Sequence, residues 1–378
     1  MKKHHVIVLL WLIVSVYGAA MAFSATYVNV TINGGNAFKE LASQIIIIII
    51  LGIMGTYVFM VSKKINTYQL MKRFSKMLMY ISLVSLALVL VIGSDSVRGG
   101  ARMVIPLGPV DFQPLELYKI ALLLYFAKIF SSVKPTETIV DSIKKLAIPG
   151  IGIILLMVQP DFGGAMICLL VIFFLLLVNG QNIKELMMAS GGVAVLGLLG
   201  FSLLQDYQKS RIYVWLDPFI DVQGSGYQLI NSYVAISNGG LFGSGFMSGI
   251  QKAGYLTQPG SDFIFATICE ELGLFGAAFT IAILVAISLV AISIGNTAHE
   301  RFGMLYCYGF GILLLTQTFI NIGGVSGVIP MTGVTLPFIS TGINSYLFLT
   351  LGVFLTIPVS RVSIKEKKRE RKAANLKG

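Results

Sequence analysis

The sequence is poor in charged residues. Charged side chains make up only 12% of the 378 residues, whereas hydrophobic residues make up 56% and the mean hydropathy is +0.83. Soluble domains carry about 25% charged residues. A soluble fold of this length could not bury so much apolar surface, but a lipid bilayer accepts it. The composition excludes a soluble globular protein and predicts an all-α integral membrane protein.

Cysteine is scarce as well. The three cysteines, Cys168, Cys269 and Cys307, all lie inside apolar segments. An odd number of cysteines in such positions gives neither a disulfide framework nor a spaced metal motif. We interpret them as small buried hydrophobic residues, and we expect no metal site built from them.

Acidic residues are outnumbered, and the formal net charge is +11. Such an excess can indicate nucleic-acid binding. The basic residues, however, lie in short loops between apolar runs and in the C-terminal tail, which is the pattern of membrane topology. We therefore expect membrane lipids, and no nucleic acid, among the partners.

Long apolar runs dominate the sequence. A helix that spans a bilayer needs about 20 mostly apolar residues. We predict about ten transmembrane helices, with the largest loop, residues 205–263, between the seventh and the eighth. We expect the first to be retained rather than cleaved as a signal peptide. The predicted helices cover residues 5–21, 41–61, 75–93, 115–132, 146–158, 163–179, 186–204, 264–294, 302–320 and 343–360.

Lysine and arginine are distributed unequally between the two sides of this arrangement. With the N-terminus in the cytoplasm, twenty of the 28 lie in inside loops or in the tail, six lie in outside loops, and Lys119 and Lys128 lie within a span. The positive-inside rule then predicts two cytoplasmic termini. Residues 1–360 form the expected polytopic domain, and residues 361–378 form a basic cytoplasmic tail. We interpret the tail as facing anionic lipids, with a partner-binding segment as the alternative.

Four outside loops are rich in glycine, proline and polar residues, unlike simple spacers. All are expected on the extracytoplasmic side, and ordered polar loops tend to carry function. The three histidines fall on the cytoplasmic side, which excludes histidine-based catalysis at these loops. The four loops are residues 94–114, 159–162, 205–263 and 321–342.

Short motifs recur through these loops in a fixed order. They are GAR at 100–102 with FQPLELYK at 112–119, QPDFG at 159–163, GYQ at 226–228 with GGLFG at 239–243, SDFIFA at 261–266 with EELG at 270–273, and NIG at 321–323 with PFIS at 337–340. From about residue 95 to 360 the sequence resembles the FtsW/RodA/SpoVE (SEDS) family of bacterial cell-wall polymerases. Residues 103–104 are Met-Val where that family usually has Arg-Trp.

This resemblance implies a SEDS-type helical bundle and a peptidoglycan glycosyltransferase of the bacterial plasma membrane. The implied reaction polymerises lipid II into β-1,4 glycan strands on the outer face, by an inverting displacement that releases undecaprenyl diphosphate. A class B penicillin-binding protein is the implied partner, and the sequence leans slightly towards the division (FtsW-like) type. The sequence neither requires nor excludes a divalent cation, Mg²⁺ or Mn²⁺, between diphosphate and carboxylate.

Asp262 is the candidate catalytic base of the implied reaction. It precedes the eighth predicted helix, where an acidic side chain beside hydrocarbon is costly and usually functional. The alternative is structural, because Ser261 or Asp262 could cap the helix N-terminus. The resemblance favours catalysis.

Further residues are candidates for substrate binding. Arg102 and Arg211 suit diphosphate, although Arg211 could instead pair with Asp217 on the surface.

Glu270 lies eight residues beyond Asp262, so the helical period places both on one face. We expect Glu270 to join Glu116 and Lys119 in a polar network, structural or catalytic. Glu116 and Lys119 could also simply pair with each other. Ser340 belongs to the last motif and is assigned to the substrate by resemblance.

Two other functions compete with the polymerase. A lipid II flippase should show polar residues near mid-membrane and repeated halves. A wall-synthesis scaffold would leave the polar outer loops unexplained. Because the polar loops cluster on one face, we favour the enzyme.

Overall fold

The structure is a computed structural model of the chain. It describes residues 2–32, 34–64, 67–93, 103–106, 111–132, 139–184, 186–188, 190–191, 206–224 and 226–375. The described part is mostly helical, as the composition predicts. Its elements are α1 (Lys3–Ile32), α2 (Ala37–Lys64), α3 (Thr67–Ile92), β1 (Ile105–Pro106), β2 (Asp111–Phe112), α4 (Pro114–Phe130), α5 (Ile139–Lys145), α6 (Ala147–Val158), α7 (Phe162–Val178), α9 (Asp206–Leu216), the 3₁₀ turn η2 (Pro218–Asp221), α10 (Tyr227–Gly239), α11 (Ile264–Asn296), α12 (Arg301–Val325) and α13 (Ile343–Asn375).

The predicted spans overlap these helices, although α1, α3 and α13 extend well beyond the predicted bounds. Among the described residues, five helices, α1, α3, α11, α12 and α13, are long and apolar enough to cross a membrane, and shorter apolar helices accompany them. Every predicted span except 186–204 overlaps one of the helices. Residues 186–204 lie largely outside the described residues, so the count of ten stays a prediction.

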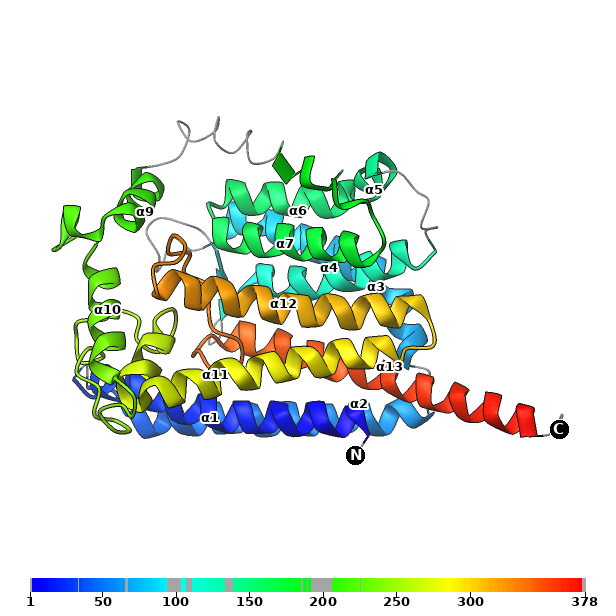
Figure 1. The fold of residues 1–378 in the computed structure, drawn as a ribbon, viewed down its shortest axis with the longest axis horizontal. Helices are drawn as coiled ribbons and strands as arrows, with labels where there is room; N and C mark the ends of the chain where they lie inside the picture. The colour runs from blue at the N-terminus through cyan, green and yellow to red at the C-terminus, as the bar shows by residue number, and fades with distance from the viewer. Residues whose placement is uncertain are drawn as a thin grey trace.

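The long helices lie side by side in one bundle with α4 at its centre (Figure 1). Helix α4 packs against α3, α6, α7, α12 and α13, and nearly all of its side chains are buried. Pro114 at its first turn suits a helix start. At the periphery, α2 exposes Ile46, Ile49 and Ile53. Apolar side chains that are exposed around a buried core fit a bundle surrounded by lipid.

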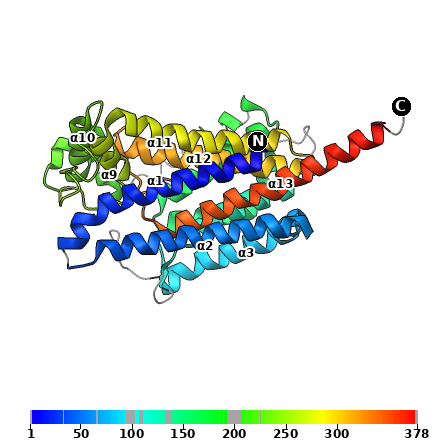
Figure 2. The same cartoon turned by 90° about the horizontal axis from the view of Figure 1, so that it is seen from below.

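The two ends of the bundle differ in shape. Helices α9 and α10 and their connecting loops cover one end, which we call the α10 end (Figure 1). At the opposite end, the C-terminal part of α13 projects beyond the other helices (Figure 2). The expected boundary at residue 360 is not a break in the secondary structure, because α13 runs through Pro358 to Asn375.

One long helix is interrupted. Gly273 in α11 has φ 62° and ψ −157°, a conformation that is essentially restricted to glycine. The segments before and after it are each helical, so residues 264–272 form a short helix ahead of the main span. The sequence predicts one continuous helix here, and the break is a finding of the structure.

Candidate active site

A cavity of about 570 Å³ opens at the α10 end of the bundle. Its walls come from the first turns of α4 and α7, from α9 and α10, from residues 257–262 before α11, and from the loop between α12 and α13. Elements far apart in the sequence therefore meet around one space. Four of the predicted site residues line it: Glu116, Lys119, Arg211 and Asp262.

Asp262 lies on the wall of this cavity with only 7% of its surface exposed. Its Oδ1 accepts a hydrogen bond from the Ser261 hydroxyl at 2.9 Å, and its backbone carbonyl accepts one from the Asn321 amide at 2.9 Å. The N-cap residue of α11 is Phe263, and no side chain caps it. Asp262 therefore lies one residue before the N-cap position of α11.

Glu116 and Lys119 form a buried ion pair on α4. The Lys119 ammonium lies 2.8 Å from the Glu116 carboxylate, and the two side chains are 2% and 5% exposed. The spacing i, i+3 places them on one face of the helix, which confirms the predicted pairing. Lys119 also donates to Gln317 Oε1 at 2.9 Å, which links α4 to α12.

Gln317 and Asn321, one turn apart on α12, hold the last loop in place. The Gln317 amide donates to the Thr335 carbonyl at 3.0 Å and to Ser345 at 3.2 Å, and the Asn321 amide donates to the Val334 carbonyl at 2.7 Å. Gln317 was not predicted from the sequence. Its signal was present, since two amides at i, i+4 in an apolar helix share a face that needs polar partners.

Arg211 projects from α9 and lines the cavity with an exposed side chain. Asp217, its alternative partner, caps η2, because its Oδ1 accepts from the Phe219 amide at 3.0 Å. Arg102, the other predicted diphosphate contact, lies outside the described residues.

Asp161 also lines the cavity and caps α7, since its Oδ1 accepts from the Gly164 amide at 2.8 Å. This agrees with a turn-forming role for the QPD motif.

Glu270 does not join Glu116 and Lys119, so the expected network of three is wrong. The Glu270 carboxylate is buried and accepts from the backbone amides of Ile250 and Gln251. The prediction placed Glu270 on one helical face with Asp262. Asp262, however, precedes the N-cap of α11 and is not part of the helix.

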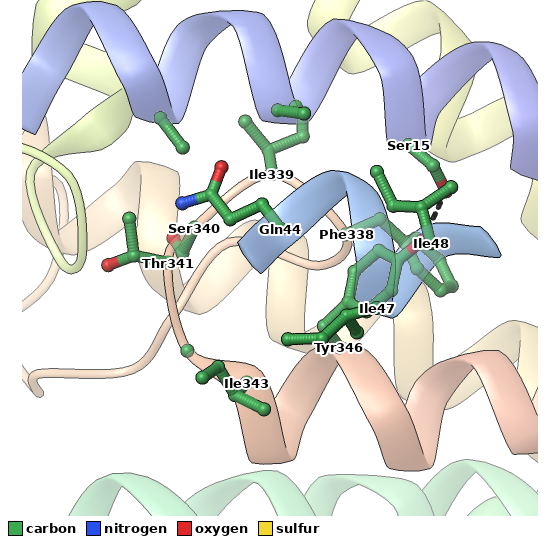
Figure 3. Close-up of a pocket in the computed structure, with 14 residues that line it drawn as sticks. Ser15, Gln44, Ile47, Ile48, Phe338, Ile339, Ser340, Thr341, Ile343 and Tyr346 are labelled. Carbon is green, nitrogen blue, oxygen red and sulfur yellow. Dashed lines mark hydrogen bonds between the residues drawn. The ribbon is translucent and has the colours of Figure 1, made fainter. Parts of the chain in front are cut away.

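Ser340 likewise has backbone partners. Its hydroxyl donates to the Ser261 carbonyl at 2.7 Å and accepts from the Leu336 amide at 2.8 Å. It lines a second, mostly apolar pocket of about 40 Å³ between α1, α2 and the last loop (Figure 3). Gly342 lines both the pocket and the cavity, so the last loop separates the two.

The charges on the cavity wall are unbalanced. Among the lining residues that the structure describes, four carboxylates face two cations: Asp111, Glu116, Asp161 and Asp262 against Lys119 and Arg211. Within the same described residues, no group of three or more His, Cys, Asp and Glu side chains could hold a metal ion by itself. An anionic ligand would therefore need positive charge beyond these two side chains.

Comparison with known proteins assigns the chain to a family. A family model described as "Cell cycle protein" (FTSW_RODA_SPOVE) matches residues 4–365. Stage V sporulation protein E of Bacillus subtilis is 35% identical in an alignment of 301 positions that covers 78% of this chain and 81% of that protein. The probable peptidoglycan glycosyltransferase FtsW of the same organism is 34% identical in an alignment of 322 positions that covers 81% of this chain and 78% of that protein.

Solved structures match over nearly the whole chain. A chain from a study of polymerization and crosslinking by a peptidoglycan synthase complex has a TM-score of 0.74 and 26% identity, covering 94% of this chain and 97% of that chain. A mutant of the rod shape determining protein RodA of Thermus thermophilus has a TM-score of 0.67 and 25% identity, covering 94% and 96%. The chain belongs to the FtsW/RodA/SpoVE family, and it is a multi-pass membrane protein.

Proposed function

We propose that this protein is a peptidoglycan glycosyltransferase that polymerises lipid II. The observation that carries the proposal is Asp262, a buried carboxylate that lines a large cavity directly before the N-cap of α11. A buried carboxylate at the end of a membrane helix is costly and points to chemistry. The FtsW relatives bear the name of this activity.

The reaction joins two lipid-linked disaccharides. The sugar 4-hydroxyl of one chain attacks the anomeric carbon of the other, and undecaprenyl diphosphate leaves with the bonding electron pair. A single displacement converts the α-linked donor into a β-1,4 linkage. Asp262 accepts the proton of the attacking hydroxyl as general base, and Arg211 interacts with the diphosphate.

Lys119 is neutralised by Glu116 and contributes less positive charge to the cavity than its formal charge suggests. A diphosphate facing this wall needs further cations. Arg102 stands one residue before Met103, which lines the cavity. A divalent cation, held by a carboxylate of the cavity wall such as Asp262, would also supply positive charge.

The site faces the outside of the cell in this proposal, and both termini are cytoplasmic. The excess of basic residues in the predicted inside loops supports this orientation. A matching structure comes from a peptidoglycan synthase complex, which supports a class B penicillin-binding protein as the partner. The division type remains the favoured role, since FtsW proteins recur among the relatives.

The proposal is tested by feeding labelled lipid II to the purified full-length protein with a class B partner and measuring glycan polymer. We expect Asp262→Ala to reduce polymer formation at least about 100-fold, as for the loss of a general base. Asp141→Ala, which removes an exposed carboxylate in α5, serves as the matched control and should leave the rate unchanged.

Equal activity in the wild type and a folded Asp262→Ala would remove Asp262 from the chemistry. If the wild type makes no polymer with any class B partner, but moves lipid II across vesicle membranes, the protein is a flippase.

A further inference from the structure

The break in α11 is filled by a distant loop. In a continuous helix, the amides of Leu274 and Phe275 would bond to the carbonyls of Glu270 and Glu271. Instead, the Leu274 amide donates to the Gly240 carbonyl at 2.9 Å and the Phe275 amide to the Leu241 carbonyl at 3.4 Å.

The carbonyls released by the break find partners in the same loop. Glu270 O accepts from the Ser244 amide at 2.9 Å, and Glu271 O accepts from the Gly245 amide at 3.0 Å. Residues 240–245 thus replace both the acceptors and the donors that two helical hydrogen bonds lose at the break. All four backbone groups at the break are satisfied, as buried backbone requires.

The side chains of Glu270 and Glu271 extend this attachment. Glu270 Oε1 accepts from the Ile250 amide at 3.0 Å, and Glu271 Oε2 accepts from the Met247 amide at 3.1 Å. A Cβ atom at Gly249 would lie 2.8 Å from Glu270 Oε2, so the loop approaches as closely as glycine allows.

Lys252 completes the cluster. Its ammonium pairs with Glu271 and donates to the Ser24 hydroxyl of α1 at 2.8 Å, and the Lys252 and Glu271 side chains are only 1% and 0% exposed. Ser24 also donates to Glu271 at 2.7 Å. We call Lys252, Glu270 and Glu271 the loop clamp, because they fasten residues 244–252 to α11 and α1.

The clamped segment leads directly to the cavity. Thr257 and Gln258, five and six residues beyond Lys252, line it, and the Gln228 amide donates to the Thr257 hydroxyl. Uncharged hydroxyl and amide groups suit the hydroxyls and acetamido groups of a sugar. Asp262 is held separately by Asn321.

We propose that the loop clamp positions Thr257 and Gln258 as the sugar-binding wall of the active site. This inference rests on the proposed polymerase function. The clamp residues do not touch the substrate, and they act through the loop. Loss of the clamp therefore weakens substrate binding, while proton transfer at Asp262 persists.

The test measures KM and kcat for lipid II polymerisation, together with hydrogen–deuterium exchange of residues 244–258, in the full-length protein. We expect Lys252→Met and Glu271→Gln each to raise KM about tenfold, with a smaller change in kcat and faster exchange. The double variant Lys252→Met/Glu271→Gln removes both charges and keeps a hydrogen-bond acceptor at residue 271. We therefore expect its KM to lie within about threefold of the wild-type value.

Glu270 gives an independent check. Glu270→Gln keeps an oxygen that accepts from the loop amides and should behave as the wild type, whereas Glu270→Leu should raise KM like the Lys252 variant. Thr257→Val and Gln258→Leu should raise KM without changing exchange at 244–252.

Unchanged KM in the single clamp variants, or a loss of kcat at unchanged KM, would overturn the proposal. So would a double variant as impaired as the single variants. A wild type without polymerase activity would overturn the proposed function instead, and exchange would still report whether the clamp holds the loop.

Discussion

The two ends of the bundle both carry ion pairs, but they bury them to very different extents. At the α10 end, the side chains of Lys119–Glu116 and Lys252–Glu271 are at most 5% exposed. At the opposite end, Lys72 lies 2.8 Å from Glu300 with the two side chains 35% and 42% exposed.

This difference separates two uses of charge. An exposed pair is screened by water and salt and contributes little to stability. A buried pair costs desolvation that a well-packed apolar pair would avoid. The desolvation cost of the buried pairs therefore favours a functional role over a stabilising one. At the α10 end, both pairs lie beside the cavity or its loop.

Breaking a buried pair should give the largest effect. Lys119→Met leaves the Glu116 carboxylate buried without its cation, and we expect a loss of about 3–5 kcal/mol in the free energy of unfolding. Thermal unfolding of the purified protein measures this. Glu116→Gln combined with Lys119→Met should recover most of the loss.

Lys128→Met is the matched control in the last turn of the same helix, where only a favourable helix-dipole interaction of about 0.3–1 kcal/mol is removed. Equal destabilisation by the two methionine substitutions would contradict the comparison between buried and partly exposed charges.

A backbone change at the α10 end should come next. In Gly273→Ala, the new Cβ would lie 2.5 Å from the Leu241 carbonyl oxygen and the Gly243 amide nitrogen, in a conformation that alanine rarely adopts. We expect a cost of about 1–3 kcal/mol, measured by thermal unfolding. In Gly150→Ala in α6, the new Cβ has no atom within 4 Å, so the substitution should be neutral or stabilising. A similar loss of stability in this variant would show that any glycine-to-alanine change destabilises the bundle.

The smallest effect belongs to the opposite end. Glu300→Gln removes one charge of the pair with Lys72 and should change stability by less than about 1 kcal/mol. The change should shrink further at high salt, because screening already weakens this contact. If Glu300→Gln instead lowered the free energy of unfolding as much as Lys119→Met does, at any salt concentration, the two ends would not differ in how they use charge.

The positions of the helices could be predicted because an apolar run of spanning length rarely forms anything but a membrane helix. The Glu116–Lys119 pair was also predictable, since both residues lie on one helix. The attachment at Gly273 was not, because it depends on Gly240 and Leu241, more than thirty residues earlier in the chain. A single glycine in an apolar helix gives no local sign of such a partner.

The burial of Lys252 could not be predicted for a related reason. From the sequence it is one of six cations in the outside loops, yet it is buried against Glu271. Loop residues are expected to be solvated unless a long-range contact covers them. Asp262 was found through the family motifs and Arg211 as a cation suited to diphosphate, and their meeting at one cavity required the structure.

The replaced hydrogen bonds at the break in α11 also constrain the length of the chain. Between Gly240 and Gly245, backbone groups are matched to fixed positions on both sides of Gly273, so one inserted or deleted residue would shift the matching groups out of register. A tag or label therefore does not belong between Gly240 and Gly245.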